Sequence, residues 1–236
     1  YLATHDPEAK QNVVESFDAL ERLYTIHTFP GYFGRSFERH GTMPFKTEFR
    51  DYLKDYWYPG YQSSVSWRQA DNPEWDWRGA SSSDQAVGQV FALTLVAQYM
   101  DDENLKQRAV KLIDGLMSHI VDNDLKLIDA DGKPTLWGIW NPEYVNRFPV
   151  MVGDRKLYSS NIIAFLQTAY YFTGKEKFKK TAEYLLYGQG YLQNLARPVR
   201  DIGRAPDSAD NWSRAMSEEW NHSDDEMYFL AYWSLY

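Results

Sequence analysis

The densest group of potentially catalytic side chains in this 236-residue chain lies near its C-terminal end. Five carboxylates and one histidine occur within residues 218–226. Crowded carboxylates raise one another's pKa, and a raised pKa lets a carboxylic acid donate a proton at neutral pH. The alternative is a solvated acidic cap at the start of a helix. The candidate catalytic residues of this segment are Glu219, His222, Asp224 and Asp225.

A further carboxylate, Asp84, follows a run of serines and opens an apolar stretch, as Asp224 does. An inverting glycosidase needs two carboxyl groups ~6.5–9.5 Å apart, one as the acid and one to activate water. Asp84 with Asp224 or Asp225 would supply such a pair. A plain helix-capping role is the other explanation for Asp84.

Aromatic residues make up 17% of the chain, with 9 Trp and 18 Tyr. They can pack in a core, and they can also line a cleft and stack on flat apolar faces such as those of sugar rings. Both explanations stay open for five tryptophans. The candidate sugar-binding residues are Trp67, Trp75, Trp77, Trp137 and Trp140.

Other polar residues suggest related chemistry. Arg35 and Arg78 lie next to predicted loop ends and would hold the carboxylate of an acidic sugar by bidentate pairing, although ordinary surface ion pairs also explain them. Tyr158 and Asn161, with His222, would suit a polysaccharide lyase, which needs a base and a group that neutralises a uronate. The sequence contains no phosphate-binding glycine loop, nucleophile elbow or dinucleotide fingerprint.

Helical periodicity dominates the elements that must position these residues. Two stretches are apolar on nearly all sides and each precedes an amphipathic stretch, which predicts an inner helix followed by an outer helix. Helices are predicted over residues 7–27, 83–100, 103–123, 160–172, 175–193 and 223–236. The remaining segments are a long aromatic loop over 41–80 with a hairpin of 63–68 against 76–79, a β-hairpin over 125–140, and a basic connection over 196–216.

The three apolar helices are predicted to begin with serine followed by Asp or Asn. Each pair can cap its helix, because the side-chain oxygen accepts from an unpaired backbone N–H. If the helices are parallel, their starts also meet at one end and form a single polar site on positive helix termini. The three pairs are Ser83-Asp84, Ser160-Asn161 and Ser223-Asp224.

Composition excludes several classes of protein. The chain has no cysteine, so disulfide scaffolds and thiolate sites are excluded, and its five histidines are scattered, which argues against zinc. We expect no cofactor and no metal. A formal charge of −8 argues against a nucleic-acid partner, and the sequence holds no apolar stretch long enough to cross a membrane.

The alternation of inner and outer helices, with polar residues at the start of the inner ones, resembles the (α/α) toroids of glycoside hydrolases and polysaccharide lyases. The resemblance is architectural and covers most of residues 7–236. It implies an all-α fold of helical hairpins in a partial or complete toroid, with a small β-hairpin and a long aromatic loop. Its segments are WRGASSSDQAVGQVFAL, GKPTLWGIWNPE, YSSNIIAFLQTAYYFTG and NHSDDEMYFLAYW.

The resemblance implies a glycoside hydrolase that acts on an oligo- or polysaccharide by carboxylate acid–base catalysis, secreted or periplasmic. We expect residues 1–236 to form one toroid-like domain of a longer chain, with other domains of that chain as further partners. The alternatives are a polysaccharide lyase and a non-catalytic glycan-binding or structural module of a larger extracellular protein.

Overall fold

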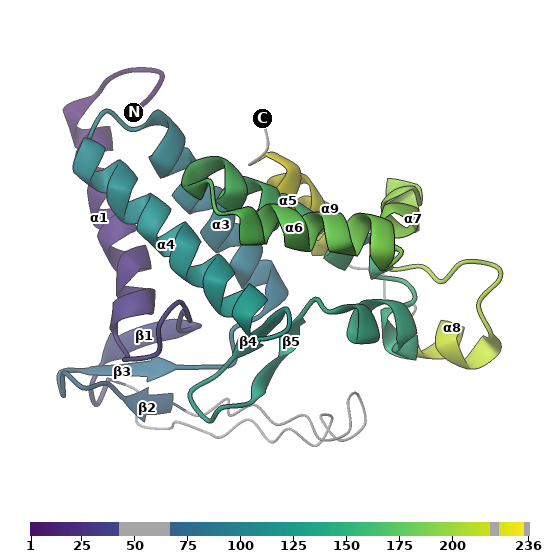
Figure 1. Cartoon of the computed structure of the whole chain (residues 1–236). Helices are drawn as coiled ribbons and strands as arrows, with labels where there is room; N and C mark the ends of the chain where they lie inside the picture. The colour runs from purple at the N-terminus through teal and green to yellow at the C-terminus, as the bar shows by residue number, and fades with distance from the viewer. Residues whose placement is uncertain (43–66, 218–221, 234–236) are drawn as a thin grey trace.

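The computed structural model describes residues 1–42, 67–217 and 222–233, without the side chains of residues 222 and 223. These residues are mostly helical, with two small antiparallel sheets, so the expectation of a helical chain with a β-hairpin is correct in its coarse form (Figure 1). The α-helices are α1 (Pro7–Thr25), α3 (Ser83–Tyr99), α4 (Glu103–Asp122), α5 (Arg155–Thr173), α6 (Glu176–Glu183), α7 (Tyr191–Leu195), α8 (Asn211–Ser217) and α9 (His222–Trp233). The strands are β1 (Ser36–Arg39), β2 (Trp67–Gln69), β3 (Trp75–Arg78), β4 (Lys126–Ile128) and β5 (Pro134–Ile139).

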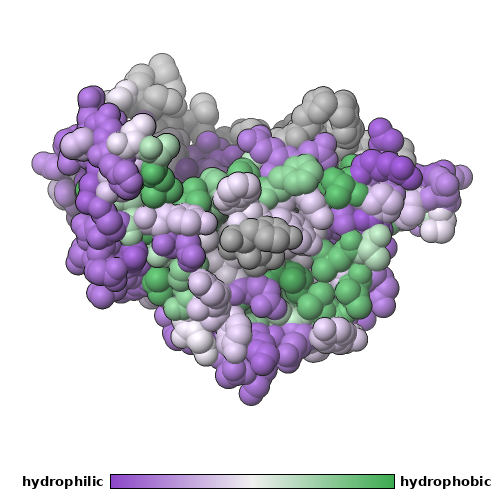
Figure 2. All heavy atoms as spheres, turned by 90° about the horizontal axis from the view of Figure 1, so that it is seen from above, coloured by the Kyte–Doolittle hydropathy of each residue, from purple (hydrophilic) through white to green (hydrophobic). Residues whose placement is uncertain are grey.

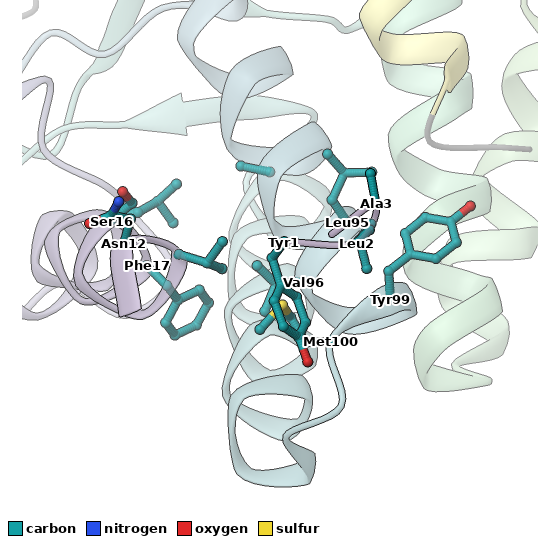
Figure 3. Close-up of a pocket in the computed structure, with 13 residues that line it drawn as sticks. Tyr1, Leu2, Ala3, Asn12, Ser16, Phe17, Leu95, Val96, Tyr99 and Met100 are labelled. Atoms are coloured by element: carbon teal, nitrogen blue, oxygen red, sulfur yellow. The ribbon is translucent and has the colours of Figure 1, made fainter. Parts of the chain in front are cut away.

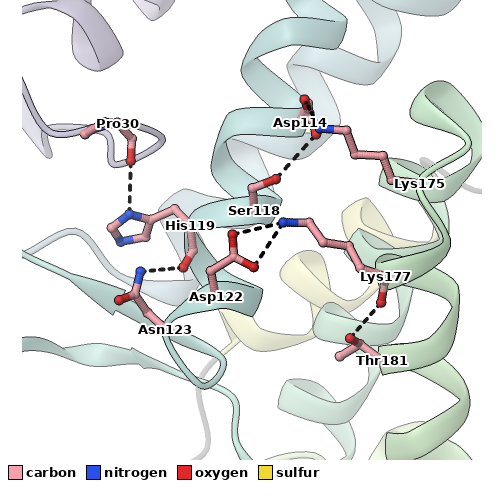
Figure 4. A network of polar contacts seen from close by, with 9 residues as sticks. All are labelled: Pro30, Asp114, Ser118, His119, Asp122, Asn123, Lys175, Lys177 and Thr181. Carbon is pink, nitrogen blue, oxygen red and sulfur yellow. Dashed lines mark hydrogen bonds and ion pairs between the residues drawn. The ribbon is translucent and has the colours of Figure 1, made fainter.

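Helices α3 and α5 form the centre of the helical part, and α4 and α6 lie outside them (Figure 1). Most residues of α3 and α5 are buried, as their uniformly apolar sequences predict, whereas α4 buries one face. The two outer helices are joined by ion pairs, in which Lys175 Nζ lies 2.7 Å from Asp114 and Lys177 Nζ lies 3.0 Å from Asp122 (Figure 4). These exposed pairs align the two helical hairpins with only a small contribution to stability.

Helix α1 begins where the sequence predicts, with Pro7 in its first turn and the Asp6 side chain accepting from the backbone N–H of Glu8 at 2.9 Å. It packs against α4. There, the Arg108 guanidinium pairs with Asp18 at 2.6 Å and with Glu21 at 2.5 Å. These pairs bridge the first helix to the first helical hairpin.

The aromatic loop contains part of a three-stranded antiparallel sheet with strand order β1-β3-β2. The predicted hairpin is confirmed where it is described, because β2 pairs with β3, but the sequence did not predict β1 as a third strand. Residues 43–66 of the predicted loop lie outside the described residues. The second sheet, β4 with β5, is the predicted hairpin around the Asp131-Gly132 turn.

Other boundaries differ from the prediction. Helix α5 begins at Arg155, before the predicted start at Ser160, because Leu157 and Tyr158 are buried in its first turns and extend its apolar face. The predicted helix over 175–193 is divided by a π-helical turn and by Gly190, whose φ is +77°. The predicted connection over 196–216 contains a 3₁₀ turn and most of α8.

Helix α9 packs against α3 and α5 but is not buried on all sides, as an inner helix would be. Phe229 and Trp233 on its outer face are 61% and 62% exposed. In the part of the chain that the structure describes, no helix is long and apolar enough to cross a membrane.

Candidate functional site

Serines fix the loop that leads from β3 into α3. The Ser81 hydroxyl donates to the carbonyl oxygen of Phe33 at 2.6 Å. The Ser82 backbone N–H donates to the side-chain oxygen of Gln85 at 3.2 Å, and the Ser82 hydroxyl donates to the carboxylate of Asp84. Asp84 is therefore held, exposed, in the first turn of α3, where the helix dipole favours a negative charge.

The start of α3 is joined to α5 and β5 by a buried tyrosine. The Ser83 hydroxyl donates to the Tyr158 oxygen at 3.1 Å, and the Tyr158 hydroxyl lies 3.4 Å from the carbonyl oxygen of Trp137. Burial raises the pKa of Tyr158 well above its ordinary value, so its hydroxyl stays protonated. This arrangement places Tyr158 against Ser83, the neighbour of Asp84, and against the backbone of Trp137.

Of the two hairpin tryptophans, only Trp137 can contact a ligand. Trp137 is 39% exposed, whereas Trp140 is fully buried with its ring 6.1 Å from that of Phe165. The expectation that Trp140 binds sugar is therefore wrong, because this side chain is part of the core. The hydroxyl of Tyr191 donates to the Trp140 carbonyl at 2.5 Å and fixes the end of β5.

Asn161 is also part of the interior. Because α5 begins at Arg155, Asn161 lies in its second turn and is 1% exposed, so it does not open the helix as predicted. Its side-chain oxygen is buried and has no hydrogen-bond partner among the described residues. Asn161 is therefore removed from the residues that could touch a substrate.

The acidic segment at the start of α9 is described only in part. Asp224 and Asp225 are half-buried in the first turn of this helix, and Glu219 lies outside the described residues, as does the side chain of His222. Further along α9, the ring of Tyr228 lies 5.3 Å from the Nζ of Lys156 in the first turn of α5. The middle of α9 therefore lies beside the start of α5.

The register of the three-stranded sheet separates its three tryptophans. Trp67 pairs with Arg78 across β2 and β3, so these two side chains share one face. Trp75 and Trp77 lie on the other face, where the Trp75 ring packs 4.4 Å from the Arg22 guanidinium and Trp77 is 3% exposed. Trp77 therefore cannot serve as an exposed sugar platform, and Trp75 is half-covered.

Sequence reasoning missed Asp129, a fully buried carboxylate that holds this region in place. One oxygen accepts from the Arg68 guanidinium at 3.0 Å, and the other accepts from the backbone N–H of Ala80 at 2.7 Å. A Cβ at Gly79 would lie 2.8 Å from the carboxyl carbon, so only glycine permits this approach. In the sequence, Asp129 is an aspartate next to the turn of the predicted hairpin, and nothing in its neighbourhood indicates that Arg68 and Ala80 are its partners.

An apolar pocket lies elsewhere, between α1 and the C-terminal half of α3 (Figure 3). It has a volume of about 590 Å³, and its lining is almost entirely apolar, including Leu2, Val13 and Tyr99. Figure 2, a view from above, shows apolar residues near the middle of that face with hydrophilic residues around them. None of the predicted site residues lines the pocket, so it does not define the candidate site.

Among residues 1–42, 67–217 and 222–233, no three His, Asp or Glu side chains converge as metal ligands would. No protein-family model, curated protein or solved structure matches the chain. The predicted site residues that side-chain contacts connect lie at the start of α3, in the first turn of α5 and in β5.

Proposed function

We propose that the chain is a carbohydrate-active enzyme, a glycoside hydrolase with its carboxylates at the starts of α3 and α9. The observation that supports this best is the placement of Asp84. Its exposed carboxylate accepts from Ser82, and the next residue back, Ser83, is bonded to Tyr158, which lies against the backbone of the half-exposed Trp137. Glycoside hydrolysis requires two carboxyl groups that flank the scissile bond, and an aromatic ring nearby can stack on the sugar.

In this proposal Asp84 is one member of the catalytic pair, and Asp224 or Asp225 is the other. One carboxylic acid protonates the glycosidic oxygen as its bond to the anomeric carbon breaks. The other takes a proton from the water that attacks this carbon. The proton given to the leaving oxygen and the proton taken from water balance, so both groups return to their starting states after the product leaves and protons exchange with solvent.

The state of Tyr158 argues against its acting as the base of a lyase. A lyase base must lose its proton readily, whereas burial raises the pKa of Tyr158, and its hydroxyl bonds within the protein to Ser83 and Trp137. We assign Tyr158 a positioning role, which is to hold the starts of α3 and α5 together. The proposal includes the architecture: α3 with α4, and α5 with α6, would be two inner–outer helical hairpins of an (α/α) toroid.

The test measures new reducing ends after the chain is incubated with a panel of neutral and acidic polysaccharides. We expect Asp84→Asn to lower the rate by at least about 100-fold, the usual contribution of acid–base catalysis. The matched control is Asp122→Asn on the outer face of α4, which removes the same charge and should leave the rate unchanged.

Three outcomes would contradict the proposal. Full activity in Asp84→Asn would exclude this carboxylate. An unsaturated product detected by its ultraviolet absorbance would indicate a lyase. Binding of a glycan without cleavage under any condition would indicate a non-catalytic glycan-binding module.

A further inference from the structure

A pocket with a mixed polar and apolar lining lies where the end of α1, the three-stranded sheet and the β4–β5 hairpin meet. Figure 1 shows the turn of this hairpin near β2. The pocket has a volume of about 470 Å³, which is within the range of small-molecule sites. Its lining includes His27, Phe29, Arg68, Gln69, Asp71 and Trp77.

This pocket is separate from the candidate catalytic site. None of Asp84, Tyr158 and Trp137 is among the described residues that line it. Arg35 and Arg78, which the sequence suggested for an acidic sugar, do not line it either. The Arg35 guanidinium instead donates to a backbone carbonyl of the loop before α3 at 3.1 Å. A ligand in the pocket would therefore contact none of the proposed catalytic groups.

Aromatic rings form one wall of the pocket. The centroid of the His27 ring lies 4.6 Å from that of Trp77 and 5.5 Å from that of Phe29. His27 and Trp77 are buried, whereas Phe29 is 36% exposed. The backbone N–H of Phe29 donates to Nδ1 of His27 at 3.3 Å, which holds Phe29 against this wall. Phe29 therefore offers an apolar face to a ligand, and the two buried rings support it.

The charges around the pocket favour a ligand without net charge. The Arg68 guanidinium lies 5.0 Å from the centre of the Trp77 ring, so the position over this ring that a cation would occupy is already filled. An anion gains little from Arg68, because the buried carboxylate of Asp129 pairs with it at 3.0 Å. An anion would also face the exposed carboxylate of Asp71, which repels it.

Hydrogen-bonding groups of both kinds surround the aromatic wall. The Asp71 carboxylate accepts, the Arg68 guanidinium donates through N–H groups that its bond to Asp129 does not use, and the Gln69 amide and Thr28 hydroxyl can do both. A purely apolar ligand would remove these groups from water without replacing their hydrogen bonds. A sugar ring suits the pocket, because its hydroxyl groups donate and accept while its C–H face packs on an aromatic ring.

We propose that this pocket is a second, non-catalytic site that binds an uncharged sugar unit of a polysaccharide. The sugar ring stacks on Phe29, and its hydroxyl groups bond to Asp71, Gln69 and Arg68. The proposal goes beyond the proposed function, because binding here requires no cleavage at Asp84. In an active hydrolase, the second site would raise the effective concentration of the polymer at the catalytic carboxylates.

The test measures binding of neutral hexasaccharides by isothermal titration calorimetry, with Asp84→Asn as the parent chain so that no substrate is cleaved. The ligands are the hexasaccharides of β-1,4-glucan, β-1,4-mannan, β-1,4-xylan and α-1,4-glucan. We expect at least one of them to bind. Phe29→Ala should weaken this binding by at least about 10-fold, and Asp71→Ala should weaken it by about 10-fold.

The matched control is Tyr187→Ala, which removes an aromatic ring that is 77% exposed elsewhere on the surface. It should bind as the parent does. Trp137→Ala tests whether the measured binding belongs to the candidate catalytic site instead. Thermal unfolding of each variant reports whether it is folded, and Asp71→Ala at an exposed position keeps the test decisive if Phe29→Ala is not.

Four results would overturn the second site. They are no binding of any neutral hexasaccharide, equal losses in Tyr187→Ala and Phe29→Ala, a loss in Trp137→Ala with none in Phe29→Ala, and a tighter Phe29-dependent affinity for tetramethylammonium or polygalacturonate than for any neutral ligand. The outcome is separate from that of the proposed function. Binding that depends on Phe29 without cleavage by the unmodified chain would support the second site and contradict the hydrolase, whereas cleavage with an unchanged KM in Phe29→Ala would do the reverse.

Discussion

Replacing Asp129 by asparagine should reveal how strongly the candidate site depends on one buried carboxylate. Asp129 accepts from Arg68 in β2 at 3.0 Å, from the Ala80 N–H before α3 at 2.7 Å and from the Ala130 N–H at 2.6 Å. Its side chain is fully buried, while that of Arg68 is 24% exposed. A single carboxylate thus connects β2, the loop into α3 and the β4–β5 hairpin.

The size of the effect follows from these bonds. Asparagine keeps the shape but replaces one accepting oxygen with an NH₂ donor, so either the Ala80 N–H or the Arg68 guanidinium faces a donor. A hydrogen bond to a charged group contributes about 1.5–3 kcal/mol, and breaking a buried ion pair costs about 3–5 kcal/mol. Because Arg68 is partly exposed and can recover some hydration, we expect Asp129→Asn to lower the free energy of unfolding by about 3 kcal/mol.

Urea unfolding followed by tryptophan fluorescence measures this loss from the midpoint and slope of the transition. The control is Asp131→Asn in the turn of the same hairpin, where the carboxylate accepts from the backbone N–H of Lys133 at 3.1 Å at an exposed position. It should cost less than about 1 kcal/mol. A loss below about 0.5 kcal/mol in Asp129→Asn, or a larger loss in Asp131→Asn, would refute the reasoning.

Three further predictions follow from burial and hydrogen bonding. Trp140→Ala should lower the free energy of unfolding by about 3–5 kcal/mol, whereas Trp137→Ala should lower it by about 1–2 kcal/mol and weaken glycan binding, as urea unfolding and calorimetry would show. Equal effects on stability would contradict the assignment of one ring to the core and the other to the surface. Tyr158→Phe should lower the free energy of unfolding by about 1–2 kcal/mol. It should also lower kcat/KM on the polysaccharide that the unmodified chain cleaves, under conditions where the variant is still folded. Burial lowers the pKa of His27 from 6.5 to about 4, so its protonation is less favourable in the folded chain than in the unfolded chain. The free energy of unfolding should therefore keep its full value above pH 6.5 and fall by up to about 3 kcal/mol as the pH drops toward 4. His27→Asn should reduce this dependence and leave the part due to His119, whose pKa burial also lowers.

The sequence predicted the helical elements well because their signal is local. Uniformly apolar α3 and amphipathic α4 can be recognised from their own residues, and α1 begins at Pro7, the predicted first residue. The predicted start of α5, Ser160, lies five residues after the observed start at Arg155. Ser160 resembles a capping residue, but the apolar face of the helix extends back to Leu157. Local capping signals cannot distinguish a true helix start from a polar residue that tertiary packing buries.

The candidate site was predicted less well, because its members are brought together by contacts between distant segments. Nothing near Trp140 shows that it is buried and Trp137 exposed, since both follow from how the β4–β5 hairpin meets α5. The separation of Trp67 from Trp75 and Trp77 follows from the register of β2 against β3, which places alternate residues on opposite faces. Register across a sheet depends on pairing that spacing within one segment does not specify.

The loop before α3 shows how stability and the proposed activity are related in this chain. Ser81 bonds to Phe33, Ala80 to Asp129 and Ser83 to Tyr158, so three separate segments hold three of the four residues from Ala80 to Ser83. The two serine bonds contribute only about 1 kcal/mol each to folding, and the bond to the charged Asp129 contributes about 1.5–3 kcal/mol. Together they fix the loop that carries Asp84, and small misplacement of a catalytic group is costly to rate. Removing either serine bond should therefore reduce catalysis more than stability, which is the behaviour expected of a preorganised site and not of a simple helix cap.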